Sequence, residues 1–196
     1  ALDEGRSAML LVPEIALTPQ LLGRMTAHFG KTVAVLHSSL RVGERYDEWR
    51  RIARGEARVV VGTRSAVFAP LQSPGLLILD EEQEHTYKSE STPRYHAREV
   101  ARYRAHQSGA LVVLGSATPS VESMFLARSG KYALVTLPER YNARALPQVS
   151  VVDMRRALRG GSGGSFLGGA VVLCRQVEHF SFIVQPCVQP ALMDVA

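Results

Sequence analysis

The sequence predicts an α/β fold in which a mostly parallel sheet is flanked by helices. Between residues 8 and 137, short apolar runs alternate with amphipathic segments, as expected for strands joined by crossover helices. The apolar run 76–79 is followed by Asp80-Glu81-Glu82-Gln83, and the run 111–114 is followed, after Gly115, by Ser116-Ala117-Thr118. Parallel strands present their carboxyl ends at one edge of a sheet, where α/β proteins bind ligands. We therefore expect both polar groups at that edge.

Six runs are predicted to be strands, at 9–12, 33–36, 59–61, 76–79, 111–114 and 133–137. The first helix is expected to begin at Thr18-Pro19, a cap followed by a first-turn proline. Further helices are expected at 43–54, 97–106 and 119–129, ending at Gly55, near Gly109 and at Gly130. Tyr46 and Trp49 lie one turn apart on the second helix. We expect them to pack in the core rather than to form a platform for bases.

Composition places the chain among ordinary soluble globular proteins. The 196 residues suffice for one domain with its own core, and hydrophobic residues make up 46% and charged residues 21%. No apolar run reaches the roughly 18 residues of a membrane-spanning helix, so a membrane partner is not expected. Cys174 and Cys187 are too few for a four-cysteine zinc site, and no histidine pair lies near them. The net charge of +5 is compatible with nucleic acid.

The two ends of the chain differ in character from its centre. The N-terminus has neither an initiator methionine nor an apolar signal segment, so we expect a cut through a longer, cytoplasmic chain. Residues 1–155 are predicted to form the α/β domain. Residues 156–196 are predicted to be a Gly/Ser linker and an atypical, poorly ordered tail, because the sequence turns to Gly and Ser at Gly160 and then carries few charges.

The acidic turn after residue 79 carries the predicted catalytic residues, Asp80, Glu81, Glu82 and Gln83. Asp80 comes first after the strand, the position from which nucleotide-hydrolysing α/β proteins hold Mg²⁺. Glu81 is expected to orient or deprotonate the attacking water. The alternative is that these acids only cap the next helix, where carboxylates are favourable.

The hydroxyl-rich turn Ser116-Ala117-Thr118 is predicted to couple nucleotide state to motion. Its side chains, together with Gln83, can form hydrogen bonds that exist in one nucleotide state only. The alternative is simple capping, because Thr118-Pro119 also fits a helix N-cap followed by a first-turn proline. The acidic turn and the hydroxyl turn together indicate a motor ATPase more strongly than either does alone.

Three further segments are predicted to contact DNA. Aromatic rings and cations are concentrated between 86 and 98, the combination that grips single strands without sequence choice. Thr63 and Arg64 follow a strand and suit a backbone phosphate, whereas the alternative makes Arg64 a surface ion-pair partner. The candidates are Pro13, Glu14, Thr18, Thr63, Arg64, Tyr87, Lys88, Arg94, Tyr95, His96 and Arg98. Thr18 is alternatively only an N-cap, and the alternative for 86–98 is a solvated loop with Tyr95 packed on the core.

Several long motifs resemble the primosomal protein N′ (PriA) family of replication-restart helicases. The likeness extends almost continuously from about residue 5 to 155. The motifs that carry it are Leu11-Val12-Pro13-Glu14-Ile15-Ala16-Leu17-Thr18-Pro19-Gln20, Leu36-His37-Ser38-Ser39-Leu40, Val61-Gly62-Thr63-Arg64-Ser65-Ala66-Val67-Phe68-Ala69-Pro70, Asp80-Glu81-Glu82-Gln83, Pro93-Arg94-Tyr95-His96-Ala97-Arg98 and Gly115-Ser116-Ala117-Thr118-Pro119-Ser120.

The resemblance implies a superfamily 2 DNA helicase that uses ATP with Mg²⁺, held in part by Asp80, and moves 3′ to 5′. It implies a RecA-like lobe over residues 1–155, bearing motifs Ia, Ib, II and III. It further implies branched and single-stranded DNA as partners, together with primosome and single-strand-binding proteins. The segment between Thr86 and Arg98 resembles an aromatic-rich loop that links DNA contact to ATP hydrolysis.

The sequence departs from the family pattern at several points. It contains no G-x-x-x-x-G-K-[ST] phosphate loop, and the family's second lobe and zinc-binding cysteines are absent. Gln83 stands where the family usually has histidine, and from Gly160 onward the likeness is expected to end. The chain alone is therefore expected to lack ATPase activity. The alternatives are another superfamily 2 translocase and a non-catalytic DNA-binding module.

Overall fold

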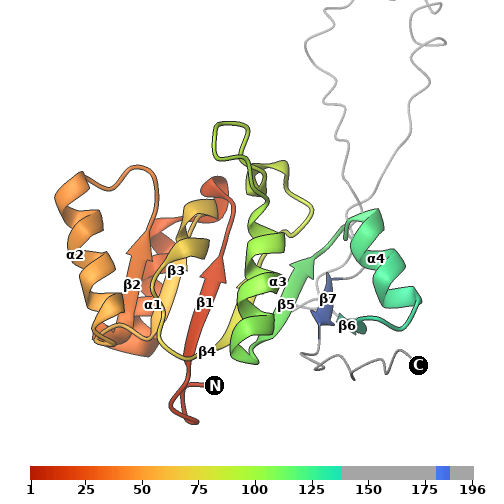
Figure 1. The fold of residues 1–196 in the computed structure, drawn as a ribbon, viewed down its shortest axis with the longest axis horizontal. Helices are drawn as coiled ribbons and strands as arrows, with labels where there is room; N and C mark the ends of the chain where they lie inside the picture. The colour runs from red at the N-terminus through yellow and green to blue at the C-terminus, as the bar shows by residue number, and fades with distance from the viewer. Residues whose placement is uncertain (138–179, 186–196) are drawn as a thin grey trace, which may run out of the picture.

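The structure is a computed structural model that describes residues 1–137 and 180–185. Within this part of the chain, seven strands form one sheet in the order β2-β3-β1-β4-β5-β7-β6 (Figure 1). Strands β1 to β5 pair in parallel, whereas β7 is antiparallel to both of its neighbours. The strands are β1 (Ser7–Leu11), β2 (Val33–Leu36), β3 (Val59–Gly62), β4 (Pro74–Leu79), β5 (Leu111–Ser116), β6 (Ala133–Leu137) and β7 (Phe180–Gln185).

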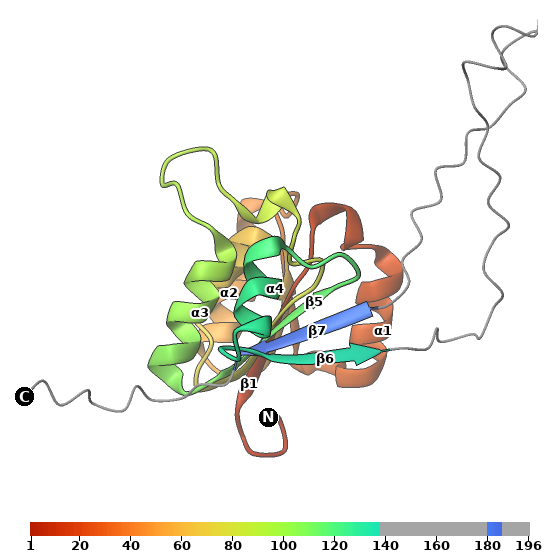
Figure 2. The ribbon, with the colours of Figure 1, turned by 90° about the vertical axis from the view of Figure 1, so that its right-hand side faces the viewer.

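Helices cover both faces of this sheet. The α-helices are α1 (Pro19–Phe29), α2 (Val42–Ala53), α3 (Ala97–Ser108) and α4 (Val121–Arg128). Figure 2 shows α1 on the face opposite to α3 and α4. Short 3₁₀ turns join several of these elements, among them η3 (Arg64–Phe68) and η4 (His85–Tyr87). The mostly parallel sheet flanked by helices confirms the predicted fold class, and the arrangement fits a RecA-like lobe.

Alternation along the central strands builds one core on each side of the sheet. Val60 joins the larger core, whereas its neighbours Val59 and Val61 join the smaller core under α1. This is the period of two that side chains follow along a strand. Helix α3 packs on the larger core through Ala97, Ala101 and Ala105, whose small side chains let it lie close to β4.

The predicted elements are all present, with differences at their ends. The strands at 33–36 and 133–137 have the predicted limits, while β5 continues two residues further, to Ser116. Helix α4 begins at Val121, and its cap is Ser120, whose Oγ accepts a hydrogen bond from the Ser123 N–H (3.3 Å). Thr118 is therefore not the N-cap, which removes the simple capping alternative for that side chain. Thr18, by contrast, does cap α1, because its Oγ1 accepts from the Leu21 N–H (3.2 Å).

The prediction that Tyr46 and Trp49 pack in the core is wrong. Tyr46 is 60% and Trp49 39% exposed. Helix α2 lies beside β2, the last strand at its end of the sheet, and buries only Ile52. A helix at the end of a sheet has less apolar surface to cover, so aromatic residues that repeat at helical spacing remain on its outer side.

Strand β7 comes from the segment 156–196, which is predicted to be poorly ordered. Its residue Ile183 is fully buried between β5 and β6. The rest of that segment and the predicted boundary at 155 lie outside the described residues. In the part of the chain that the structure describes, none of the helices combines the length and apolar character needed to cross a membrane.

Candidate functional site

The carboxyl edge of the parallel strands gathers the predicted polar residues. Asp80 directly follows β4, and Ser116 closes β5, the next strand in the sheet, which pairs with β4 from Leu76↔Leu111 to Leu79↔Leu114. On the other side of β4, β1 leads to Val12 and Pro13, and β3 leads to Thr63. Neighbouring parallel strands therefore place the acidic turn, the hydroxyl turn and two DNA candidate segments along one edge.

Glu81 adopts an unusual backbone conformation in the acidic turn. Its φ of 48° lies in the left-handed region, which residues other than glycine seldom occupy. Two hydrogen bonds hold the turn: Asp80 N donates to the Leu11 carbonyl (2.9 Å), and Glu81 N donates to Asp80 Oδ1 (3.1 Å). Strained residues of this kind collect at functional sites, where the surrounding structure holds them.

The Asp80 carboxylate is poorly solvated for a charged group. Burial raises its pKa, the neighbouring Glu81 charge raises it further, and the Glu81 N–H opposes both effects. A hard cation relieves this cost, because carboxylate oxygens are the ligands that Mg²⁺ prefers. Asp80 and Glu81 therefore fit one side of a metal–nucleotide site. Among the described residues, no group of three or more His, Cys, Asp or Glu forms a complete metal cage.

A chain of hydrogen bonds joins the acidic turn to the hydroxyl turn. Gln83 Nε2 donates to Glu81 Oε2 (2.9 Å), and Ser116 Oγ donates to Gln83 Oε1 (2.5 Å). Ser116 Oγ in turn accepts from the Thr118 N–H (2.9 Å). Ala117, between the two hydroxyl residues, contributes no polar side chain. The amide of Gln83 thus uses its donor and its acceptor to connect two loops that follow different strands.

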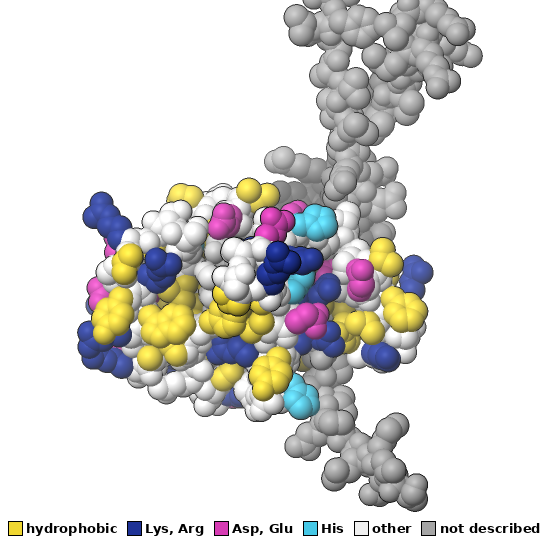
Figure 3. Space-filling view, turned by 45° about the horizontal axis from the view of Figure 1, so that its top comes forward, with side chains coloured by type: hydrophobic (Ala, Val, Ile, Leu, Met, Phe, Trp, Pro, Cys, Tyr) yellow, Lys and Arg dark blue, Asp and Glu magenta, His cyan; other side chains and the backbone are white. Residues whose placement is uncertain are grey.

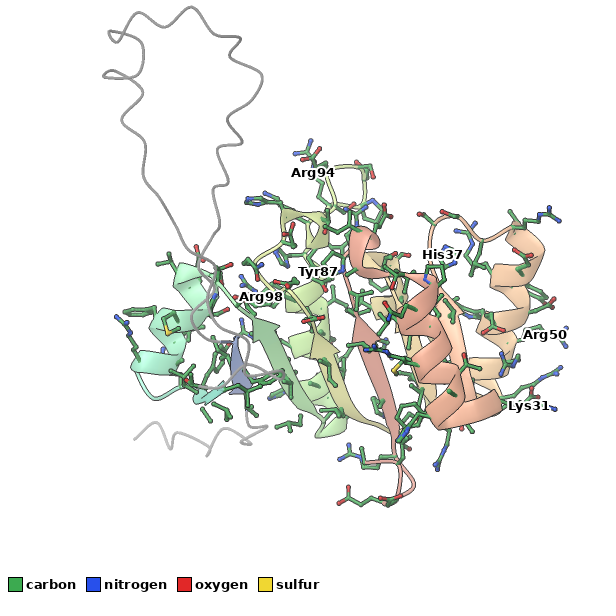
Figure 4. The ribbon with its side chains drawn as sticks, turned by 180° about the vertical axis from the view of Figure 1, so that it is seen from behind. Lys31, His37, Arg50, Tyr87, Arg94 and Arg98 are labelled. Atoms are coloured by element: carbon green, nitrogen blue, oxygen red, sulfur yellow. The ribbon has the colours of Figure 1, made fainter. Side chains whose placement is uncertain are left out.

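Glu82 faces away from this chain. Its side chain is 0% exposed and accepts four hydrogen bonds, from Arg98 Nη1 (2.9 Å), Ser120 N (2.6 Å), Ser120 Oγ (3.1 Å) and Ser123 Oγ (3.1 Å). These donors lie at the starts of α3 and α4. The structure therefore gives Glu82 a positioning role, and the guanidinium of Arg98 is directed to Glu82 and the start of α4 (Figure 4). Sequence reasoning missed Ser120 and Ser123, whose S-x-x-S spacing at a helix start is the available signal.

Tyr87 also lies inside the fold. It is 1% exposed, and its hydroxyl lies 2.9 Å from the Leu11 carbonyl and 2.6 Å from the Asp80 carbonyl, so its one proton is shared between the ends of β1 and β4. Burial, followed by the Asp80 charge, raises the pKa of Tyr87. Its ring presents no face to a base in this arrangement. Through these two contacts, Tyr87 stabilises the backbone at the start of the acidic turn.

The segment 88–96 forms a loop that projects from the carboxyl edge (Figures 1 and 4). A β-bridge pairs Lys88 with His96, and Ser89 N donates to the Tyr95 carbonyl (2.7 Å). Arg94 lies exposed at the outer end of the loop. His96 caps α3 by accepting from the Arg98 N–H on Nδ1 (3.2 Å), and burial, with the charge of Arg98, lowers its pKa.

Tyr95 is half-buried at the base of this loop. Its ring meets Phe68 edge-on, with centroids 4.8 Å apart, and the Arg64 guanidinium lies 5.9 Å from its centre. Part of the Tyr95 ring is therefore packed against the protein, as the alternative for this residue predicts, and part remains exposed. Arg64 Nη1 donates to the carbonyls of Thr86 (3.2 Å) and Lys88 (2.6 Å), so Arg64 holds the start of the loop.

Two cavities lie side by side along the same edge. The first, of about 460 Å³, is lined by Pro13, Glu14, Thr63, Arg64 and Lys88 among others. The second, of about 180 Å³, shares Glu14 and Thr63 and adds His37, Ser38 and Ser39. Gly62 lets the end of β3 lie close to the end of β2 at this edge, because a Cβ on it would lie 2.2 Å from the Leu36 carbonyl oxygen. We call this pair of cavities the edge groove.

Gly30-Lys31-Thr32 has the composition of the end of a phosphate loop but the wrong position. It follows α1 and precedes β2, so it lies at the amino end of that strand. Figure 4 shows Lys31 at the opposite end of the sheet from His37, which follows β2. A phosphate loop follows a strand and opens a helix, so these three residues are not one.

Comparisons with known proteins place the chain in a family of helicases. The family described as "DEAD/DEAH box helicase" matches residues 1–125. "Replication restart protein PriA" of Bacillus subtilis (strain 168) is 54% identical over 178 residues, which is 91% of this chain and 22% of that protein. The proteins of the same name from Synechocystis and Haemophilus influenzae are 48% identical (84% of this chain, 20% of that protein) and 39% identical (79% and 21%).

The chain spans about one fifth of the length of these relatives. The match to the Bacillus subtilis protein covers 178 of the 196 residues and so extends past Gly160, which corrects the expectation that the likeness ends there. Among solved structures, "the C-terminal part of Fun30 ATPase domain" matches 55% of this chain and 33% of that chain, with a TM-score of 0.35 and 12% identity. The family match over residues 1–125, together with relatives that are all named replication restart proteins, shows that the chain belongs to the DEAD/DEAH box helicases, in the group of the PriA proteins.

Proposed function

We propose that the chain is the part of an ATP-dependent DNA helicase that links nucleotide state to DNA contact during replication restart. The observation that carries the proposal is the hydrogen-bonded path from Glu81 through Gln83 to Ser116 and Thr118. Its acidic end fits ATP chemistry, and the same sheet edge holds the edge groove and the loop 88–96. The names of the relatives support replication restart as the setting.

At the acidic end, Asp80 would hold the cation of a bound nucleotide and Glu81 would orient the attacking water. A Mg²⁺ ion held there would supply positive charge to the phosphates. Asp80 is kept in place by its backbone bond to Leu11 and by Tyr87, which contacts the Asp80 carbonyl. Glu81 has a left-handed backbone and its carboxylate accepts from Gln83, so that a change at Glu81 reaches Ser116 through the Gln83 amide.

On the DNA side, we propose that a single strand lies along the edge groove. Thr63, Pro13 and Glu14 form its floor, and Lys88, Arg94 and the exposed part of Tyr95 reach it from the loop 88–96. Arg64, Tyr87 and Arg98 act as positioning residues, because their polar groups already bind within the protein. Branched DNA, movement from 3′ to 5′, and primosome and single-strand-binding proteins as partners follow from the family relationship.

The test is Glu81→Gln in the full-length helicase that contains this segment. The variant keeps a side chain of the same size but cannot accept a proton, so we expect ATP turnover to fall at least 100-fold while nucleotide binding persists. Glu122→Gln, on the exposed first turn of α4, is the matched control. Turnover at the unmodified rate in Glu81→Gln would refute the assignment.

The chain alone is expected to show no ATP turnover, because its sequence supplies no phosphate-loop lysine. For the same reason, a second candidate function is a non-catalytic DNA-binding module, favoured by the presence of the whole edge groove in the described residues. DNA binding by the full-length protein that ATP leaves unchanged would favour this second candidate.

A further inference from the structure

Helix α2 has an outer face that the helicase proposal does not use. The helix lies beyond β2, and its inner side is occupied: Glu48 Oε2 accepts from the Val35 N–H (3.0 Å), and Arg51 Nη2 donates to the carbonyls of Lys31 (2.5 Å) and Val33 (3.3 Å). Glu48 and Arg51 also pair with each other at 2.6 Å. These contacts fix which side of α2 faces the sheet.

The outer face of α2 combines apolar and aromatic residues with arginines. Val42, Tyr46 and Trp49 recur at helical spacing and are all exposed. Arg45 precedes Trp49 by one turn, and Arg50 follows Tyr46 by one turn, with its guanidinium carbon 5.5 Å from the Tyr46 ring centre. Figure 4 shows Arg50 pointing away from the fold, and Figure 3 shows yellow and dark-blue side chains adjoining at this end of the molecule.

Charge is segregated around this helix. The acids of α2 are Glu44, Asp47 and Glu48, and helical spacing places them with Arg51 on the other side. Neither Arg45 nor Arg50 forms an ion pair with a carboxylate among the described residues. The outer face is therefore aromatic and cationic, and the nearest acids, Asp47 one turn before Arg50 and Glu48 one turn after Arg45, do not pair with these arginines.

We propose that this α2 face, made of Val42, Arg45, Tyr46, Trp49 and Arg50, binds single-stranded nucleic acid. Flat rings stack on unpaired bases and arginines hold phosphates, a combination that suits single strands of any sequence. Arg50 also stays beside the Tyr46 ring, where its charge remains available to a phosphate.

The position of the face favours a nucleic-acid strand over a protein partner. Helix α2 begins just after His37, Ser38 and Ser39, which line the second cavity of the edge groove. A strand that leaves the groove over this loop next meets Val42 and Arg45 on the first turn of α2. The inference rests on the proposed function, because it assumes that the protein binds DNA. It concerns a separate surface, however, so it can be wrong while the proposed function is right.

Trp49 gives a direct readout, because it is the one tryptophan in the sequence. The purified 196-residue chain is titrated with fluorescein-labelled oligo(dT), and anisotropy reports total binding. In parallel, unlabelled oligo(dT) is added while tryptophan emission is followed. We expect emission to be quenched over the same concentration range as the anisotropy change, and both to weaken as salt is raised.

Charge reversal separates this face from the edge groove. In the double variant Arg45→Glu, Arg50→Glu, we expect the affinity to fall at least tenfold and the quenching to disappear. Its matched control is Arg24→Glu, Arg128→Glu, which makes the same change in net charge at exposed arginines on α1 and α4 and should bind like the unmodified chain. Trp49→Phe keeps a flat ring and should retain anisotropy binding, which also shows that the α2 face tolerates substitution.

Each other outcome counts against the inference. One such outcome is that oligo(dT) binds normally by anisotropy, Trp49 emission is not quenched, and the variant Lys88→Glu, Arg94→Glu abolishes the binding. That result overturns the inference for the α2 face and leaves the DNA side of the proposed function intact. If the chain binds no DNA at all, both the inference for the α2 face and the DNA side of the proposed function are contradicted. Quenching by an oligo-glutamate peptide but not by oligo(dT) assigns the face to an acidic protein and also overturns it.

Discussion

At the scale of single residues, the acidic turn is held in a state that costs stability. Asp80 is charged but partly dehydrated, and Glu81 occupies a left-handed backbone conformation. Asp80 is held from outside the turn by Leu11 and Tyr87, and Glu81 is held within the turn by Gln83. Glu82, one residue later, is fully satisfied by four donors. The Asp80 carboxylate thus costs stability, whereas the Glu82 carboxylate stabilises the fold through its four hydrogen bonds.

The substitution Asp80→Asn is expected to stabilise the chain at neutral pH. Burial raises the pKa of folded Asp80 above its unfolded value, so the unfolded chain releases this proton first and ionisation weakens the fold as pH rises through the folded pKa. Asparagine removes that cost and can still accept from the Glu81 N–H. Thermal unfolding should give a higher Tm than the unmodified chain at pH 7, with the difference vanishing below the ordinary pKa of 3.8.

Asp47→Asn, at an exposed position on α2, is the control and should leave Tm nearly unchanged. A Tm for Asp80→Asn below that of the unmodified chain at pH 7 would show that the carboxylate is stabilising in the fold. In that case the charge balance described for this turn would be incorrect.

At the scale of elements, α2 closes the edge of the sheet with side chains. A terminal strand exposes backbone groups that invite pairing with another chain. Glu48 accepts a hydrogen bond from the Val35 N–H, and Arg51 donates one to the Val33 carbonyl, as the backbone of a neighbouring strand would. The helix is therefore attached by polar contacts and by Ile52, which leaves its outer side available.

Removal of one of these contacts should loosen β2 locally. Glu48→Ala leaves the Val35 N–H without its partner and breaks the ion pair with Arg51, so we expect a loss of about 1–3 kcal/mol in unfolding free energy. Amide hydrogen exchange at Val35 should accelerate, while exchange in β4 stays slow. Asp47→Ala is the neighbouring control, and unchanged exchange at Val35 in Glu48→Ala would contradict the edge-closing role.

Sequence patterns predict the elements well and the orientation of several side chains poorly. Apolar runs bounded by glycine and proline locate all six of the predicted strands, because burial at the centre of a parallel sheet leaves a strong local signal. Tyr46 and Trp49 lie on the surface rather than in the predicted core, since helical spacing does not reveal whether a helix lies over a sheet or beyond its end. Tyr87 is buried, and a local concentration of aromatic and cationic residues does not reveal which rings face inward. The inward turn of Arg98 depends on Glu82, Ser120 and Ser123, which only the tertiary fold brings together.

At the scale of the whole molecule, the sheet is completed by a strand from far along the chain. Strands β5 and β6 run in the same direction and are separated by the width of one strand, which β7 fills in the opposite direction. Ile183 of β7 joins the larger core. Its burial was not predicted, because a six-residue run with four apolar residues in a low-charge tail does not by itself indicate a partner strand.

Ile183→Ala is expected to lower the unfolding free energy by about 2–5 kcal/mol, because it opens a cavity among fully buried side chains. Urea unfolding followed by circular dichroism measures the change. Val135→Ala, on the exposed surface of β6, is the control and should cost far less. Equal stability of the Ile183→Ala and unmodified chains would mean that β7 does not hold this place in solution.

The late arrival of β7 has a consequence during synthesis. Strands β1 to β5 and α1 to α4 can assemble as soon as residues 1–128 have been made, but β5 still lacks its neighbour on one side. The 51 residues from 129 to 179 must be added before Phe180 appears, which takes roughly 3–10 s at ribosomal speeds. Throughout that interval, the nascent chain carries an unpaired strand edge beside its nearly finished core. That interval is when the chain is most open to pairing with the wrong strand and when a chaperone has most to protect.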